Sequence, residues 1–143
     1  MKVLSLLFLT FFLGKSCDTE KKQDVETAVM EYVANTRGFY QKITVQKQMV
    51  AVSKERNSPE TGTPRKISDA QWKKIIAAFQ EVTLEDLPNL KSPTEKRFYD
   101  GAAVANLKIT FKGKTYESTP FDHGNPPVEI EKLVTIITDL AKE

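Results

Sequence analysis

The sequence is poor in the residues on which many small proteins depend. Among its 143 residues Cys17 is the only cysteine, so no disulfide can form within the chain and a disulfide-stapled scaffold is excluded. His123 is the only histidine, which leaves too few recognisable ligands for a typical zinc site, so we expect no metal and no other cofactor. The sequence also lacks a phosphate-binding glycine loop, a Gly-x-Ser-x-Gly elbow and a His-Glu-x-x-His motif. Nothing in it argues for an enzyme.

Long apolar runs are scarce too. The one clear run is the eleven-residue segment Val3–Leu13, which follows the positive Lys2. A run of that length is too short to span a bilayer as a mature helix, and the small residues Gly14 and Ser16 suit cleavage by a signal peptidase. We therefore predict a signal peptide over residues 1–16. No second run of about eighteen apolar residues follows, so no transmembrane helix is predicted.

The end of this segment, Leu13-Gly14-Lys15-Ser16-Cys17, resembles the lipobox of bacterial lipoproteins. That family has Leu three places before the cysteine and Ala, Ser or Thr two places before it, where this chain has Gly14 and Lys15. The resemblance implies that Cys17 carries a lipid, that residues 17–23 form a polar tether, and that the chain is anchored to a membrane of the cell envelope, on its periplasmic or surface side. Cleavage without lipidation would instead give a secreted protein with a free terminal thiol.

Net charge does not point to nucleic acid. The net charge of +2 arises from Lys2 and Lys15 of the predicted signal segment, so the remaining chain has 19 basic and 19 acidic residues. A balanced chain provides no general attraction for phosphate backbones or anionic surfaces. We expect no nucleic-acid partner.

Residues 24–143 are long enough for one domain, and hydrophobic periodicity predicts three helices in it. The first covers 24–35 and ends before Gly38. The second covers 69–80 and begins with a capping box formed by Ser68 and Gln71. The third is opened by Pro126-Pro127 and presents an apolar face as far as Leu140.

Two hairpins are predicted between these helices. Runs at 39–45 and 49–52 form the first, and runs at 103–111 and 114–119 form the second, around a Lys112-Gly113 turn. Segments 53–66, 91–97 and 121–125 are predicted loops, and Leu84, Leu87 and Leu90 a short turn. The expected fold is α+β: a four-stranded antiparallel sheet from two hairpins, covered on one face by two or three helices.

This order of elements is similar to that of small uncharacterised bacterial lipoproteins. The similarity rests on the Ile67–Trp72 helix start, the Leu84–Leu87 turn and the hairpin around Lys112-Gly113-Lys114. No activity comes with this resemblance, so it implies no catalytic residue.

Strand alternation suggests one candidate binding face. It is predicted to carry five side chains opposite the core, with Thr110 and Ser118 beside them: Tyr40, Lys42, Thr44, Lys108 and Tyr116. Aromatic residues are enriched at interfaces, so this face could contact another envelope protein or a polymer. An ordinary solvated face is the alternative. The favoured function is a non-enzymatic binding module.

An alternative function is an envelope hydrolase or metal-dependent enzyme built on Asp100, Asp122 and His123. A carboxylate beside an imidazole raises its basicity, as a general base or a metal ligand requires. The competing interpretation is a polar turn in which Asp122 or Asn125 caps the last helix.

Overall fold

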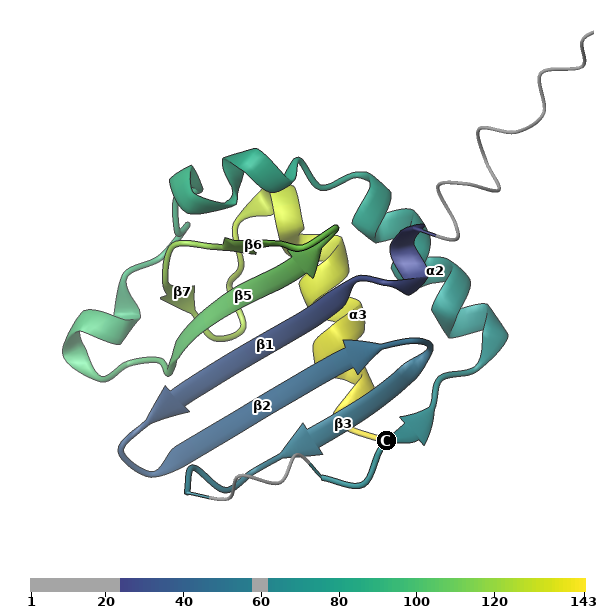
Figure 1. The fold of residues 1–143 in the computed structure, drawn as a ribbon. Helices are drawn as coiled ribbons and strands as arrows, with labels where there is room; N and C mark the ends of the chain where they lie inside the picture. The colour runs from purple at the N-terminus through teal and green to yellow at the C-terminus, as the bar shows by residue number, and fades with distance from the viewer. Residues whose placement is uncertain (1–23, 58–61) are drawn as a thin grey trace, which may run out of the picture.

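The computed structural model describes residues 24–57 and 62–143. The predicted signal peptide, Cys17 and the 17–23 tether lie outside this part. The described chain forms an antiparallel sheet of seven strands in the order β4-β3-β2-β1-β5-β6, with β7 also paired to β5 (Figure 1). The strands are β1 Val29–Thr36, β2 Phe39–Gln46, β3 Met49–Ser53, β4 Arg65–Lys66, β5 Val104–Phe111, β6 Lys114–Glu117 and β7 Phe121–Asp122.

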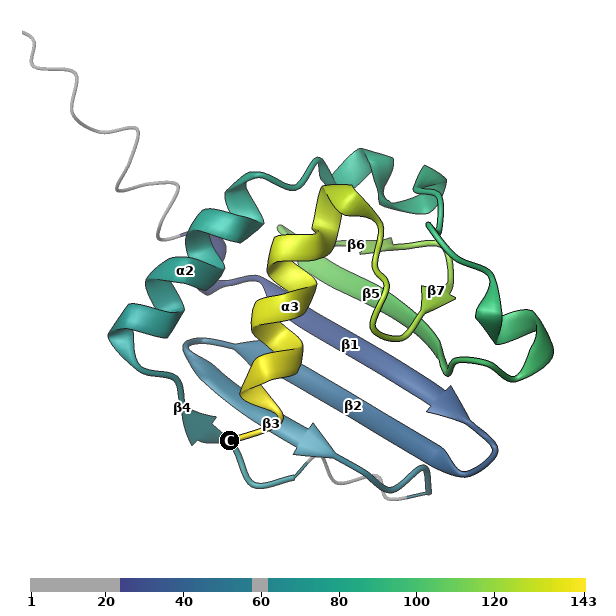
Figure 2. The same ribbon diagram turned by 180° about the vertical axis from the view of Figure 1, so that it is seen from behind.

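Two α-helices cover one face of this sheet. They are α2, Asp69–Gln80, and α3, Glu131–Leu140, and Figure 2 shows α3 lying across the middle strands with α2 beside it. Three 3₁₀ helices lie in the connections: η1 Leu84–Asn89, η2 Lys96–Tyr99 and η3 Val128–Ile130. No described helix covers the opposite face, which is turned to the viewer in Figure 1. The predicted α+β class is confirmed, and so is the placement of helices on one face.

The predicted helix over 24–35 is wrong. Only residues 24–26 are helical, and β1 follows at once. Met30, Tyr32 and Ala34 are fully buried, while the residues between them face the other side. This period of two is that of a strand. The segment satisfies both periods, and pairing with two neighbouring strands decides in favour of the strand.

Strand β1 also corrects the predicted size of the sheet. The two predicted hairpins exist, as β2–β3 and β5–β6, but they do not pair with each other. β1 lies between them and pairs antiparallel with both β2 and β5. With β1, β4 and β7 added, the predicted four strands become seven. β4 falls within the predicted loop 53–66, β7 within the predicted loop 121–125, and η2 begins within the predicted loop 91–97.

The turn between β2 and β3 shows how a sequence without a turn signature is accommodated. Lys47 and Gln48 have φ angles of 50° and 59°, the left-handed region that a two-residue hairpin turn requires and that non-glycine residues avoid. The Gln48 side chain donates hydrogen bonds to the Ile67 carbonyl (2.8 Å) and the Asp69 carboxylate (2.7 Å). The Ile67 amide in turn donates to the Gln48 carbonyl at 2.8 Å. These bonds to the start of α2 offset the unfavourable turn geometry.

Helix α2 forms as predicted. The Ser68 hydroxyl accepts a hydrogen bond from the Gln71 amide at 3.2 Å, as a capping box requires. Its predicted apolar stripe is buried: Trp72, Ile75, Ile76 and Phe79. On α3 the corresponding buried residues are Leu133, Val134, Ile137 and Leu140, and these meet the buried side chains of β1, β2 and β5 in one core. Within the described residues, neither helix is long and apolar enough to cross a membrane.

Truncation of Trp72 should be among the most costly changes to the core. Its side chain is only 5% exposed, so we expect Trp72→Ala to lower the free energy of unfolding by about 3–5 kcal/mol, the usual cost of removing a buried aromatic. Urea denaturation followed by circular dichroism measures this. Lys73→Ala, an exposed neighbour on the same helix, is the control and should change it by less than about 0.5 kcal/mol. A loss below about 1 kcal/mol for Trp72→Ala would mean that α2 packs by another face.

Candidate functional site

The first candidate site is the sheet face that the helices leave uncovered, here called the open face. Cross-strand pairing aligns Thr44 of β2 with Glu31 of β1, and Glu31 with Lys108 of β5. Tyr40 and Lys42 lie four and two residues before Thr44 on the same strand and therefore point to the same side. The structure thus places four of the five predicted residues together on the open face: Tyr40, Lys42, Thr44 and Lys108.

Glu31 organises the charge of this face. Its carboxylate lies 3.2 Å from the Lys42 ammonium and 3.5 Å from the Lys108 ammonium, so one acid on the central strand links a lysine on each neighbour. These side chains are all partly exposed, and such ion pairs contribute little to stability because water screens them. The sequence analysis did not place Glu31 on this face because its segment was predicted to be a helix.

Tyr40 lies at the end of the open face beside the loop that follows β3. The Arg56 guanidinium is centred 6.0 Å from the Tyr40 ring, and it also donates a 2.6 Å hydrogen bond to the Thr36 carbonyl. Arg56 therefore ties the end of β1 to the aromatic ring of β2. Further along β2, the Thr44 hydroxyl is buried and is the only such side-chain atom in the described residues without a hydrogen-bond partner.

The fifth predicted residue, Tyr116, does not belong to the open face. It pairs with Ile109, a fully buried residue of the helix-covered side, and it packs partly buried against the core. Ser118 is also misplaced: it is buried, and its hydroxyl accepts a 2.9 Å hydrogen bond from the Leu107 amide. The two-residue turn at Lys112-Gly113 sets this register, and sequence reasoning assigned the wrong parity to the returning strand.

The second candidate site surrounds Asp122, whose side chain is completely buried. Its carboxylate accepts hydrogen bonds from the Thr94 hydroxyl (2.5 Å) and from the backbone amides of Lys96 (2.7 Å) and Arg97 (3.1 Å). The Arg97 guanidinium adds an ion pair at 3.1 Å. Because Lys96 and Arg97 open η2, Asp122 of β7 satisfies the free amides at the start of a helix 25 residues away in sequence.

This environment keeps Asp122 ionised. Burial alone would raise the pKa of its carboxyl group, but the hydrogen bonds from Thr94, from the Lys96 and Arg97 amides and from the Arg97 guanidinium outweigh it and lower the pKa to about 2. The prediction that Asp122 or Asn125 caps the last helix is wrong, since neither η3, with Pro127 at its N-cap, nor α3, with Ile130 at its N-cap, has a side-chain cap.

His123 has a different partner. Its Nδ1 lies 2.7 Å from the hydroxyl of Tyr32, a fully buried residue of β1. The imidazole lies between two aromatic rings, with centroids 5.5 Å from Phe39 and 5.9 Å from Tyr32. Burial, assisted by the positive charge of Lys142, lowers the pKa of His123, and burial raises that of Tyr32, so both groups are neutral at pH 7.

The predicted Asp–His pair therefore does not form. Asp122 is bonded to Arg97 and its loop, whereas His123 is bonded to Tyr32. Asp100 ends η2 with an exposed side chain and a left-handed backbone, φ 58°. Over residues 24–57 and 62–143, no three His, Cys, Asp or Glu side chains gather closely enough to hold a metal ion. The arrangement suits packing and loop anchoring better than proton transfer.

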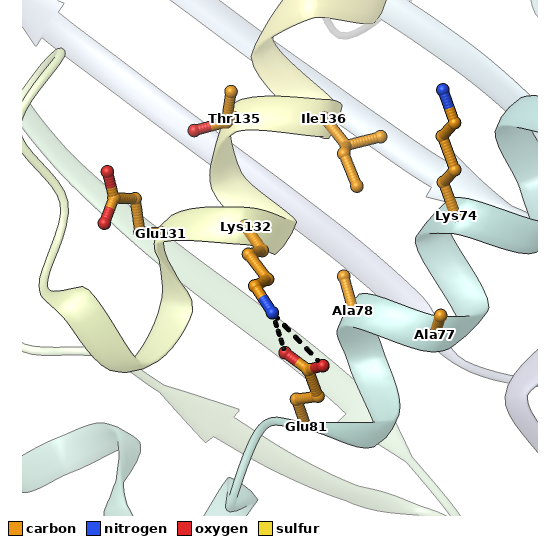
Figure 3. A pocket seen from close by; sticks show the side chains of 8 residues that line it. All are labelled: Lys74, Ala77, Ala78, Glu81, Glu131, Lys132, Thr135 and Ile136. Carbon is orange, nitrogen blue, oxygen red and sulfur yellow. Dashed lines mark hydrogen bonds and ion pairs between the residues drawn. The ribbon is translucent and has the colours of Figure 1, made fainter.

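A shallow groove of about 490 Å³ runs between α2 and α3 (Figure 3). Ala77 and Ala78 of α2 and Ile136 of α3 line it, and Lys132 forms a 3.0 Å ion pair with Glu81 from one helix to the other. We interpret the groove as the space that two small alanine side chains leave between packed helices.

The buried carboxylate should make the domain sensitive to acid. A pKa lowered from 3.8 to about 2 means that Asp122 stabilises the fold above pH 4 and that this stabilisation, about 2 kcal/mol, is lost as the pH falls toward 2. Asp122→Asn should lack this dependence and should lower the free energy of unfolding at pH 7 by about 3–5 kcal/mol, because it leaves Arg97 buried without its counter-charge. Urea denaturation between pH 2 and 7 compares the two proteins.

Asp100→Asn is the matched control, since it removes an exposed carboxylate at a left-handed position that asparagine tolerates. It should change the free energy of unfolding by less than about 0.5 kcal/mol. Equal effects of the two substitutions would contradict the anchoring role of Asp122.

Comparison with protein families and with curated proteins does not assign these sites a function. No protein-family model matches the chain, and no curated protein matches it in sequence. The resemblance of residues 13–17 to a lipobox, and that of the domain to small bacterial lipoproteins, therefore stay predictions. What the chain does has to be inferred from its own residues and contacts.

Proposed function

We propose that this chain is a lipid-anchored protein of the cell envelope that acts as a non-enzymatic binding module, with the open face as its contact surface. The observation that carries this proposal is the face itself. The described helices lie on the other side of the sheet, and the open face presents Tyr40 beside the charges of Lys42, Glu31 and Lys108. A sheet face that mixes an aromatic ring with polar groups resembles the composition of protein interfaces.

The contacts of Asp122 support a binding role over a catalytic one. A general base needs a free carboxylate or an imidazole oriented by one. Here the Asp122 carboxylate is occupied by Thr94, Lys96 and Arg97, and His123 is neutral and bonded to a tyrosine. Asp122 and His123 thus each have a structural partner.

Anchoring would act through Cys17. We expect the chain in the membrane fraction of its native host to begin at Cys17 and to be heavier by a diacylglycerol, with or without a further acyl chain. Intact-mass spectrometry measures this directly. Cys17→Ser should move the chain to the soluble fraction, because a lipid chain supplies the membrane affinity of an anchored protein. A soluble wild-type species beginning at Cys17 without added mass would refute the anchor.

The open face can be tested by photo-crosslinking in intact cells. A photoreactive phenylalanine analogue at position 42 should give a discrete adduct, whereas the same analogue at position 73, exposed on α2, should not. Tyr40→Ala should reduce the adduct several-fold while changing the free energy of unfolding by less than about 1 kcal/mol, since Tyr40 lies outside the core.

Tyr116→Ala is the matched control because its ring packs against the core. It should destabilise the domain by roughly 2 kcal/mol. Adducts of equal strength from positions 42 and 73, or an adduct unaffected by Tyr40→Ala, would refute the open face as the contact surface.

A further inference from the structure

Helix η2 displays two neighbouring aromatic rings to solvent. Phe98 is 71% exposed and Tyr99 is 72% exposed, far above Phe39, the next most exposed aromatic residue among those the structure describes, at 40%. Exposed rings add little to folding stability, and a cluster of large exposed apolar side chains commonly marks an interaction site. Two adjacent residues of this kind therefore indicate an interaction site.

Hydrogen bonds hold the backbone segment that carries the two rings in place. Four hydrogen bonds from the η2 region converge on the buried Asp122 carboxylate, and Arg97, the residue before Phe98, is one of the donors. Arg97 also donates to the Ser92 hydroxyl (3.1 Å) and the Thr94 carbonyl (2.9 Å). A surface that is already ordered loses little conformational entropy when it binds.

Each ring also has one side supported. The Arg97 guanidinium lies 4.4 Å from the centre of the Phe98 ring. The Tyr99 ring packs so closely on Gly101 that an added Cβ there would come within 3.0 Å of Tyr99 Cε2. The exposed fractions show that most of each ring surface is nevertheless free. The two rings, here called the platform, are therefore each held by one neighbour and largely open to solvent.

Polar residues flank this platform in the sequence. Glu95 and Lys96 precede the rings and Asp100 follows them, and all three side chains are exposed. They supply both hydrogen-bond acceptors and a donor at the margin of an apolar surface. The chemistry that fits is a ligand with apolar faces and hydroxyl-rich edges. Sugar rings have both, because their C–H face can stack on the negatively charged face of an aromatic ring.

The position of η2 agrees with such a ligand. Figures 1 and 2 both show the turn that precedes β5 at the end of the sheet opposite the start of β1, and the proposed anchor precedes β1 in the chain. An anchored domain would therefore hold the platform away from its anchor. We propose that Phe98 and Tyr99 form a stacking platform for a polysaccharide of the cell envelope, an inference that rests on the proposed function and names the class of its partner.

The test uses the full chain purified in detergent and three probes: chitohexaose, cellohexaose and purified peptidoglycan. Titration calorimetry suits the two oligosaccharides and co-sedimentation suits peptidoglycan. We expect binding to at least one probe, and the double substitution Phe98→Ala with Tyr99→Ala should weaken it about tenfold or more, as removal of contact aromatics does at interfaces. Tyr99→Phe, which keeps the ring, should bind within about threefold of the wild type.

Val128→Ala is the matched control, because Val128 is 76% exposed and lies outside η2. It should bind like the wild type. The double variant should keep the wild-type melting temperature, since the side chains that it loses are mostly exposed. Absence of binding to all three probes at millimolar concentration, or equal binding by the double variant, would overturn the proposal.

Tyr40→Ala measured in parallel separates this proposal from the open face. Loss of sugar binding in Tyr40→Ala alone would overturn the platform and leave the open face as the binding surface. If the double variant loses a protein crosslink and keeps its affinity for all three sugars, the platform docks a protein and the polysaccharide proposal is wrong. Crosslinking from position 42 still tests the proposed function when no sugar binds.

Discussion

Strand β1 joins two hairpins, which do not pair with each other, into one sheet. Its backbone pairs with β2 on one edge and β5 on the other, so loss of β1 would leave two separate ribbons with exposed edges. Its side chains serve both faces: Tyr32 is buried under the helices, and Glu31 bridges Lys42 and Lys108 on the open face. The core and the candidate binding surface therefore depend on the same eight residues.

At the end of the sheet near η2, the buried negative charge of Asp122 holds a connecting segment in place. An isolated carboxylate in the interior is very unfavourable, so Asp122 has to be surrounded by donors. Those donors come from the segment around η2, which explains why that segment is ordered although it has no buried apolar residue of its own. It also explains why Asp122 is not available to His123. One electrostatic requirement thus fixes the loop geometry and removes the catalytic pair.

The sequence predicts well those elements that are specified locally. Helix α2 has its cap and stripe within a dozen residues, and each hairpin is defined by short alternating runs. It fails at β1, because Val25, Ala28, Val29, Tyr32 and Val33 match a helical face, whereas the strand buries the alternating set Met30, Tyr32 and Ala34. The choice between helix and strand is decided only by pairing with the neighbouring strands. One of these, β2, follows a turn, and the other, β5, lies far away in the chain. Tyr116 was misplaced for a related reason: one residue of register moves a side chain to the opposite face.

The long-range contacts around the Asp122 and His123 side chains had almost no local signal in the sequence. Asp122 and Arg97 are 25 positions apart, and neither position forms a pattern with its neighbours in sequence. The same holds for Tyr32 and His123, which are 91 positions apart. Phe98 and Tyr99 follow Arg97 in the segment that the Asp122 network holds in place, and both rings are largely exposed. A ligand that covers them would therefore bind a surface that the fold has already set in place.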